Sequence, residues 1–282
     1  MMTEEQLDLT LTGIDEELRA RNVPIVYRSF HGYFDFLGKA NVTSSHPLAD
    51  KAREWFSRQY GSRELPDELR GNVPVLLRGD VYCMKLPIFW GPMEICCEPV
   101  RPDEPHVIQP PHFKVVDHVV GLTAQFSASL TYEELRELRL TFAHSYRNYG
   151  PIRDAESSTL ELIKEGCADR RLAIAALLHS VPSNGLSKWQ SLQSTEKFLK
   201  AYIAKQGQKY PWSHDVVELA CVGERLGLRG LAYKDLVEVQ CTTHVRYDKS
   251  LVTVREAVDA FSAGLRICSS VAVGLGFPYD MQ

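Results

Sequence analysis

The amino-acid sequence predicts an α+β protein, with a mainly antiparallel sheet and helices over residues 1–150 and an up-and-down helical bundle over residues 151–282. Two observations predict this division. β-Branched and aromatic residues, which favour strands, concentrate between positions 73 and 130. After position 130 the apolar residues recur at the three- and four-residue spacing of helices. The segment Asn148–Ile152 contains glycine followed by proline, which typically ends a helix, so we place the domain boundary there.

The composition indicates a protein with an apolar core and no broad basic surface. Of the 282 residues, 44% are hydrophobic and 24% are charged, and the net charge is −4. This balance argues against non-specific nucleic-acid binding over the whole surface. The first residues lack the basic-then-apolar order of a signal peptide, and the longest apolar runs, such as Leu172–Leu178, are too short to span a bilayer. We therefore expect a cytoplasmic protein without membrane contact.

The cysteine and histidine spacings do not favour a metal site. Seven cysteines are scattered along the chain and match no zinc pattern, so we expect reduced thiols. His106, His112 and His118 are evenly spaced, but Pro110 and Pro111 interrupt any continuous strand that would place them on one face. We expect neither a metal nor a cofactor.

The first sixty residues predict two helices around a strand. Positions 4–20 form an amphipathic helix, because apolar residues such as Leu7 and Leu18 share one face. The aromatic-rich segment Ile25–Phe36 predicts a strand followed by an irregular segment. Its aromatic side chains either pack at a core edge or stack on bases of single-stranded nucleic acid. Pro47–Tyr60 predicts a helix, with proline placed in the first turn.

Strand signals then continue from Val73 to Leu130. Val75–Leu86 predicts a strand with a bend or bulge at Gly79. A second strand is expected after the turn at Gly91 and Pro92. A proline-rich loop follows it and ends at Pro111. The predicted strands after this loop are residues 113–120 and one more that ends at Leu130.

Helical signals take over at Thr131. This threonine and Glu134 form a capping box, which predicts a helix that runs to about Arg147. The last helix has the most regular apolar spacing in the chain. The further helices are expected at about 155–166, 168–180, 188–206, 215–226 and 252–272.

Residues 155–272 resemble the HEPN family, named for higher-eukaryote and prokaryote nucleotide-binding domains. The resemblance depends on the order of four segments rather than on any one motif. Ala168–His179 resembles the small-residue-rich first core helix, and Gln190–Ile203, with Glu196 and Lys200, resembles the second. The segment 209–219 contains the histidine–aspartate pair that opens the third helix, and Arg246–Asp248 is similar to the turn before the final one.

The resemblance implies a helical bundle that is often dimeric. Members of the family bind nucleotides, cut RNA, or partner nucleotidyltransferases in toxin–antitoxin and phage-defence systems. Ribonuclease members carry an arginine and, after four to six residues, a histidine. Here positions 251–253, where that histidine would follow Arg246, are leucine, valine and threonine. We therefore expect a non-catalytic protein, a homodimer, that binds a nucleotide, an RNA or a protein partner, in a bacterial stress or defence setting.

The alternative is a metal-independent ribonuclease. Arg139 and His144 have the required spacing on the helix before the boundary, and Arg101 and His106 repeat it in the proline-rich loop. A ribonuclease needs a histidine to move protons and an arginine to hold the phosphate. Arg139 and His144 supply both if two subunits bring their helices together. The other interpretation of this pair is an ordinary polar helix face.

The binding residues that the bundle suggests centre on Glu196. This glutamate falls on the apolar stripe of its helix, so it should point inward, with Lys200 one turn later. A buried carboxylate needs a partner, which we expect to be His179 or His214. Together with Arg246, the residues Glu196, Lys200 and His214 form the predicted nucleotide or phosphate pocket. The alternative is a buried ion pair that sets helix register.

Overall fold

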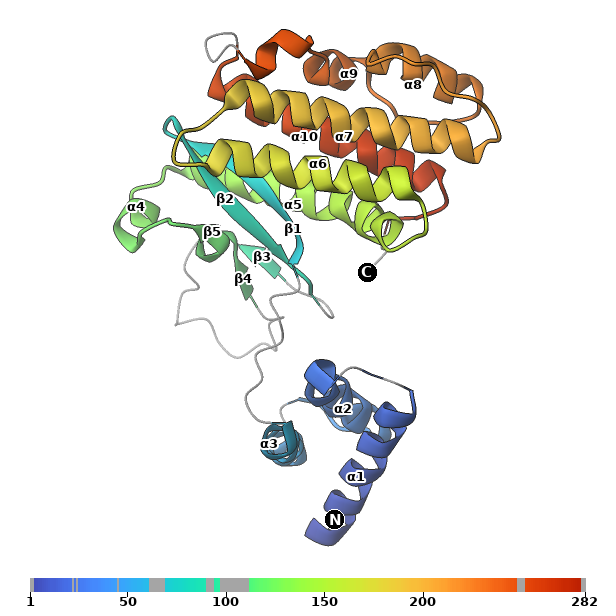
Figure 1. Ribbon diagram of the computed structural model, residues 1–282. Helices are drawn as coiled ribbons and strands as arrows, with labels where there is room; N and C mark the ends of the chain where they lie inside the picture. The colour runs from blue at the N-terminus through green and yellow to red at the C-terminus, as the bar shows by residue number, and fades with distance from the viewer. Residues whose placement is uncertain are drawn as a thin grey trace. The chain divides into compact units, whose positions relative to one another are not determined.

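The computed structural model describes residues 3–21, 23, 25–44, 46–60, 69–89, 94–96, 112–247 and 252–279. The chain divides into two compact units, residues 1–68 and residues 69–282 (Figure 1). This division differs from the boundary expected near residue 150. The predicted helix end at that position is wrong, because α5 (Tyr132–Glu156) continues through Gly150 and Pro151. Both of these residues are buried, so packing around them holds the helix despite the proline.

The first unit consists of α1 (Glu4–Ala20), α2 (Ile25–Ala40) and α3 (Pro47–Tyr60). The helices predicted at 4–20 and 47–60 are confirmed, and the strand predicted from Ile25 is wrong. In α2, Phe36 is fully buried in a shared core, and Gly32 lies against the ring of Phe56 so closely that no Cβ would fit. Phe36 is therefore a core residue. The side chains of Tyr27 and Phe30 lie outside the described residues.

The second unit contains the predicted antiparallel sheet. Strands β1 (Leu69–Leu77), β2 (Asp80–Pro87) and β5 (Val119–Val120) form it in the order β1-β2-β5. Arg78 and Gly79 have φ angles of 50° and 96° and form the β1–β2 turn, so the single strand predicted there is a hairpin. Short strands β3 (Glu94–Cys96) and β4 (His112–Lys114) pair in parallel.

Two strand predictions after residue 111 are wrong. The long strand predicted from Phe113 is interrupted by a 3-10 turn, η1 (Val115–His118). The strand predicted to end at Leu130 is the short helix α4 (Ala124–Ala128), which Thr123 caps by accepting a hydrogen bond from the backbone of Phe126.

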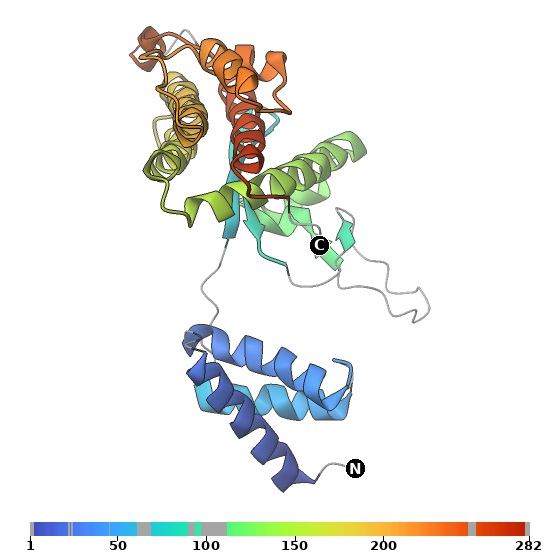
Figure 2. The ribbon, with the colours of Figure 1, turned by 90° about the vertical axis from the view of Figure 1, so that its right-hand side faces the viewer.

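The remaining chain forms a helical region, so the α+β class is confirmed. The capping box at Thr131 is present, and the two helices predicted at 155–166 and 168–180 are one. Helices α6 and α7 lie side by side, α10 packs on α7, α9 and α5, and the sheet packs on α5 and α6 (Figures 1 and 2). The elements are α6 (Glu161–Leu178), α7 (Asn184–Lys205), α8 (Val216–Arg225), α9 (Tyr233–Val239), η2 (Thr243–Arg246) and α10 (Val254–Gly274).

Helix α10 is long and apolar enough to cross a membrane by length and composition alone. However, 67% of the apolar stretch of α10 that gives it this character is buried inside the protein. Phe261, Leu265 and Cys268, which set its apolar spacing, lie in the core shared with α7. Packing against other helices therefore accounts for the apolar character of α10.

Candidate anion-binding site

The burial predicted for Glu196 is confirmed, and so are its predicted partners Lys200 and His214. Its side chain on α7 is buried, and its Oε1 atom accepts a hydrogen bond from Lys200 Nζ at 2.5 Å. Its Oε2 atom accepts from His214 Nδ1 at 2.8 Å and from Gln193 Nε2 at 3.1 Å. The partner predicted at His179 is wrong, because this residue ends α6 on an exposed position.

Arg246 lies near this cluster without touching the carboxylate. Its guanidinium carbon is 4.8 Å from the centroid of the Trp189 ring, and that ring is 5.8 Å from the ring of His214. Both oxygens of Glu196 already accept hydrogen bonds from protein groups. The arrangement favours a buried ion pair that joins α7 to the segment before α8, rather than a ligand pocket.

Arg139 and His144 do not come together within one chain. Both are exposed on α5, five residues apart. Five residues correspond to a rotation of about 140° around a helix, so the two side chains leave different faces. The copy of this spacing at Arg101 and His106 lies outside the described residues.

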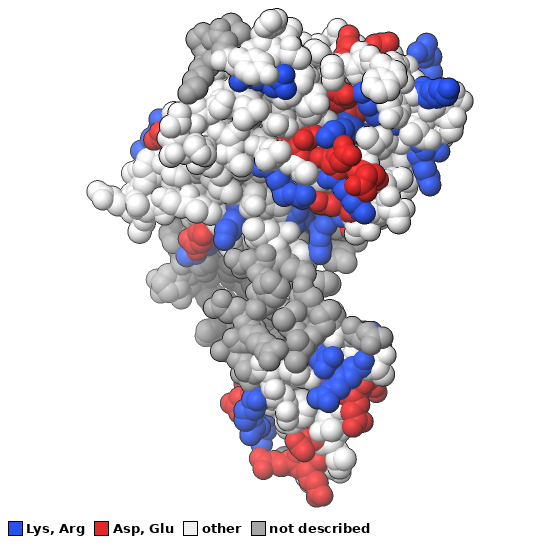
Figure 3. Space-filling view, viewed as in Figure 1, with Lys and Arg blue, Asp and Glu red and all other residues white. Residues whose placement is uncertain are grey.

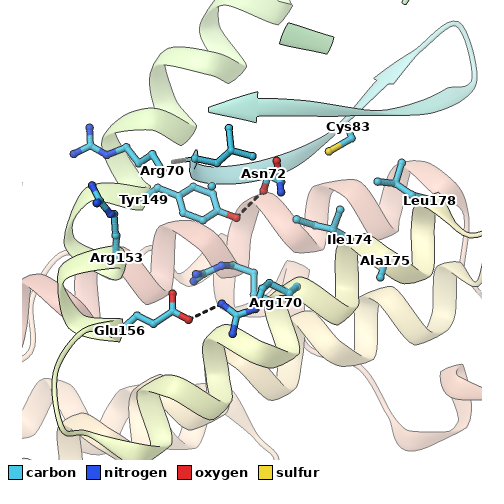
Figure 4. A pocket seen from close by; sticks show the side chains of 13 residues that line it. Arg70, Asn72, Cys83, Tyr149, Arg153, Glu156, Arg170, Ile174, Ala175 and Leu178 are labelled. Carbon is cyan, nitrogen blue, oxygen red and sulfur yellow. Dashed lines mark hydrogen bonds and ion pairs between the residues drawn. The ribbon is translucent and has the colours of Figure 1, made fainter. Parts of the chain in front are cut away.

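A cavity that the sequence did not predict lies between the sheet and the helices α5 and α6 (Figure 4). It has a volume of about 410 Å³. Its lining is rich in arginine, and one wall, formed by α6, is apolar. The lining residues are Leu69, Arg70, Gly71, Asn72, Cys83, Tyr149, Arg153, Glu156, Arg170, Arg171, Ile174, Ala175 and Leu178. We call this cavity the arginine pocket.

Arg170 is the buried member of the arginine pocket. The residue is 5% exposed, and its Nη1 atom has no hydrogen-bond partner among the described residues. Its Nη2 atom donates to Cys167 Sγ at 3.5 Å, which is a weak contact, and the guanidinium carbon is 4.8 Å from the centroid of the Tyr149 ring. Burial by itself lowers the pKa of this guanidinium, but the Tyr149 hydroxyl and the Cys167 thiol raise it, so the group stays charged.

Two further groups of the pocket have defined roles in its geometry. The hydroxyl of Tyr149 donates to the backbone oxygen of Asn72 at 2.6 Å, which ties α5 to β1. At the outer side, Arg171 Nη1 donates to Glu156 Oε1 at 2.5 Å, and the Arg171 side chain is 62% exposed. The carboxylate of Glu156 therefore pairs with the exposed Arg171.

The surface over α6 and α7 has no continuous basic field on the face that Figure 3 shows. On the face that carries α6 and α7, acidic and basic side chains are intermixed (Figure 3). Lys197, for example, lies 2.8 Å from Asp169 and 3.2 Å from Glu165. Such a surface agrees with recognition of a small anion at one site rather than with a broad field for nucleic acid.

Among the described residues, no three histidine, cysteine, aspartate or glutamate side chains gather in a way that could hold a metal ion. Of the three histidines considered for a metal, His106 lies outside the described residues, as does the side chain of His112. His118 stacks on Phe113, with the ring centroids 4.1 Å apart. This contact gives His118 a packing role.

No protein-family model, curated protein or solved structure matches the chain. The resemblance to the HEPN family therefore stays a prediction from the sequence, as do the homodimer and the cytoplasmic location.

Sequence reasoning missed the arginine pocket, although one signal for it was present. Arg170 falls on the same α6 stripe as the buried residues Cys167, Ile174 and Leu177. A charged residue on an apolar stripe is expected to be buried and therefore to need a partner. The pocket residues outside α6 come from β1, β2 and α5, and no local pattern connects them.

Proposed function

We propose that this protein is a non-catalytic binding protein for a small phosphorylated ligand of the nucleotide class, which it holds in the arginine pocket. One observation supports this most directly: Arg170 is buried and charged, and its Nη1 donor has no acceptor among the described residues. An unsatisfied buried donor costs about 1–3 kcal/mol, and more when it is charged. A phosphate group offers several strong acceptor oxygens, and the planar guanidinium matches them well.

The size of the arginine pocket supports a small ligand. Its volume of about 410 Å³ lies within the range of roughly 300–1,000 Å³ that is usual for small-molecule sites. Arg70, Arg153 and Arg171 line it together with Arg170, so β1, α5 and α6 all contribute guanidinium groups to the lining.

The lining favours binding over catalysis. Among the described residues that line the pocket there is no histidine that could move a proton. The carboxylate of Glu156 is paired with Arg171. Burial raises the pKa of the Cys83 thiol, which keeps it protonated and a poor nucleophile at neutral pH. We therefore favour a binding protein over an enzyme.

Calorimetric titration with inorganic phosphate and with adenosine 5′-monophosphate tests the proposal. Wild-type protein should bind both, and Arg170→Met should weaken both at least tenfold, because charge-assisted hydrogen bonds contribute about 1.5–3 kcal/mol. Arg139→Ala, at an exposed arginine outside the pocket lining, is the control and should bind as wild type does. If neither anion binds, or if Arg170→Met binds as well as wild type, the proposal fails.

A further inference from the structure

We infer that the ligand of the arginine pocket is an organic phosphate whose body carries a hydrogen-bond donor, and that the side chain of Asn72 accepts from this donor. This inference rests on the proposed function and adds a second recognition element to it.

The side chain of Asn72 has a buried, unsatisfied acceptor. Its Oδ1 atom has no hydrogen-bond partner among the described residues. The hydroxyl of Tyr149 bonds to the backbone oxygen of Asn72, so it does not satisfy the side chain. A buried acceptor in this state costs about 1–3 kcal/mol. Oδ1 has almost no solvent-accessible surface, so a donor on the ligand reaches it, and removes this cost, once the Asn72 side chain turns towards the cavity.

Strand alternation places Asn72 on the pocket side of the sheet. The neighbouring residues Val73 and Val75 are buried in the core. Since successive side chains of a strand point to opposite faces, Asn72 and Cys83 share the other face. Asn72 lies opposite Lys85 in the register, which makes Cys83 its diagonal neighbour, and both Asn72 and Cys83 line the pocket (Figure 4).

Tyr149 contacts both Arg170 and Asn72. The guanidinium of Arg170 lies over the Tyr149 ring at 4.8 Å, and the hydroxyl of the same ring contacts the Asn72 backbone at 2.6 Å. Arg170 and Asn72 therefore adjoin the same aromatic side chain from α6 and from β1 (Figure 4).

Arg170 and Asn72 need different partners, because the guanidinium of Arg170 donates hydrogen bonds and the side-chain carbonyl of Asn72 accepts them. At neutral pH a phosphate group is mainly an acceptor, so it satisfies Arg170 and offers little to the Asn72 carbonyl. A hydroxyl or amino group on the body of the ligand supplies the missing donor. The apolar wall of Ile174, Ala175 and Leu178 can cover the carbon atoms of that body. An inorganic phosphate ion would leave the Oδ1 atom of Asn72 without a donor and would not cover the apolar wall of the pocket.

Three probes test the inference by calorimetric titration. They are inorganic phosphate, ribose 5-phosphate, and cyclopentylmethyl phosphate, which has a similar five-membered ring without hydroxyl groups. Wild-type protein should bind ribose 5-phosphate about three- to tenfold more tightly than the cyclopentyl compound, the range that one net hydrogen bond supplies. Asn72→Leu should abolish this difference and change the affinity for inorganic phosphate less than about twofold.

Asn148→Leu is the matched control, because Asn148 bonds to the His144 backbone outside the pocket lining and should leave the preference for ribose 5-phosphate intact. If Asn72→Leu does not fold, Asn72→Asp, which keeps the acceptor, decides instead. Asn72→Asp should bind all three phosphates more weakly but still bind ribose 5-phosphate more tightly than the cyclopentyl compound.

Alkylation followed by mass spectrometry locates the bound ligand. Ribose 5-phosphate should slow the modification of Cys83 in the pocket, and the exposed Cys221 should react at an unchanged rate. If the ribose and cyclopentyl compounds bind wild type equally, and binding still depends on Arg170, the inference about Asn72 is wrong and the proposed function stands. If no probe binds or protects Cys83, both are wrong.

Discussion

Replacement of Arg170 by methionine separates a binding role from a structural one. The substitution removes a cation–π contact with Tyr149, which contributes about 1–2 kcal/mol when partly desolvated. It also removes the buried Nη1 donor that lacks an acceptor among the described residues, and an unsatisfied donor costs about 1–3 kcal/mol. The two effects oppose each other. We therefore expect the free energy of unfolding to change by less than about 2 kcal/mol in either direction.

Phosphate binding should respond much more strongly to the same substitution. Loss of the charge-assisted hydrogen bonds should raise the dissociation constant for phosphate at least tenfold. Urea unfolding followed by circular dichroism measures the first quantity, and calorimetric titration with phosphate measures the second.

Arg171→Met is the matched control for stability at the next position. Its ion pair with Glu156 is exposed on the arginine side, so its loss should cost less than about 1 kcal/mol of unfolding free energy. The reasoning would be refuted if Arg170→Met lost more than about 3 kcal/mol and still bound phosphate as wild type does. Arg170 would then be a structural cation.

Four other perturbations test separate parts of the structure. Lys200→Met leaves the buried Glu196 carboxylate without its ammonium partner and should lower the free energy of unfolding by about 3 kcal/mol. Adding Glu196→Gln to this variant removes the unpaired charge and should restore most of the lost stability. Urea unfolding of both variants checks this. The hydrogen bond from Arg78 lowers the pKa of Glu134 to about 2, against an ordinary value of 4.5. The unfolded chain therefore binds a proton first as the pH falls, and stability is lost between about pH 4.5 and 2; Glu134→Gln should make the urea midpoint less dependent on pH in that window. Because Arg139 and His144 leave different faces of α5, His144→Ala should leave any cleavage of total RNA unchanged; cleavage that this variant abolishes would support the ribonuclease alternative. At Gly71 a Cβ atom would lie 2.3 Å from the Tyr149 ring, so Gly71→Ala should lower the free energy of unfolding by about 1–3 kcal/mol and weaken phosphate binding, as thermal melting and titration would show.

Local signals predicted the elements whose structure depends mainly on neighbouring residues. The capping box at Thr131 opens α5, and the apolar spacing of 4–20 forms α1. The same kind of signal failed for α2, because its aromatic residues favour strands. That segment is helical since Gly32 lets the Phe56 ring approach and Phe36 completes a core shared by three helices.

Glu196 shows how much the apolar stripe of one helix can predict about a polar residue that lies on it. Its place among apolar residues predicted that it is buried and that Lys200 is near, and both are confirmed. The choice between His179 and His214 depended on where two distant segments lie, and helical spacing contains no information on that point.

The sequence alone specifies that the chain is α+β, where α1, α3, α5, α8 and α10 begin, and that a carboxylate on α7 must find a cation. Only the tertiary structure shows that Arg170 is buried beside Tyr149 with a donor unsatisfied among the described residues, and that Asn72 from a distant strand lies near it. The physical reason is that capping and periodicity act within one or two helical turns. Desolvation and hydrogen-bond satisfaction depend on every segment that surrounds a side chain.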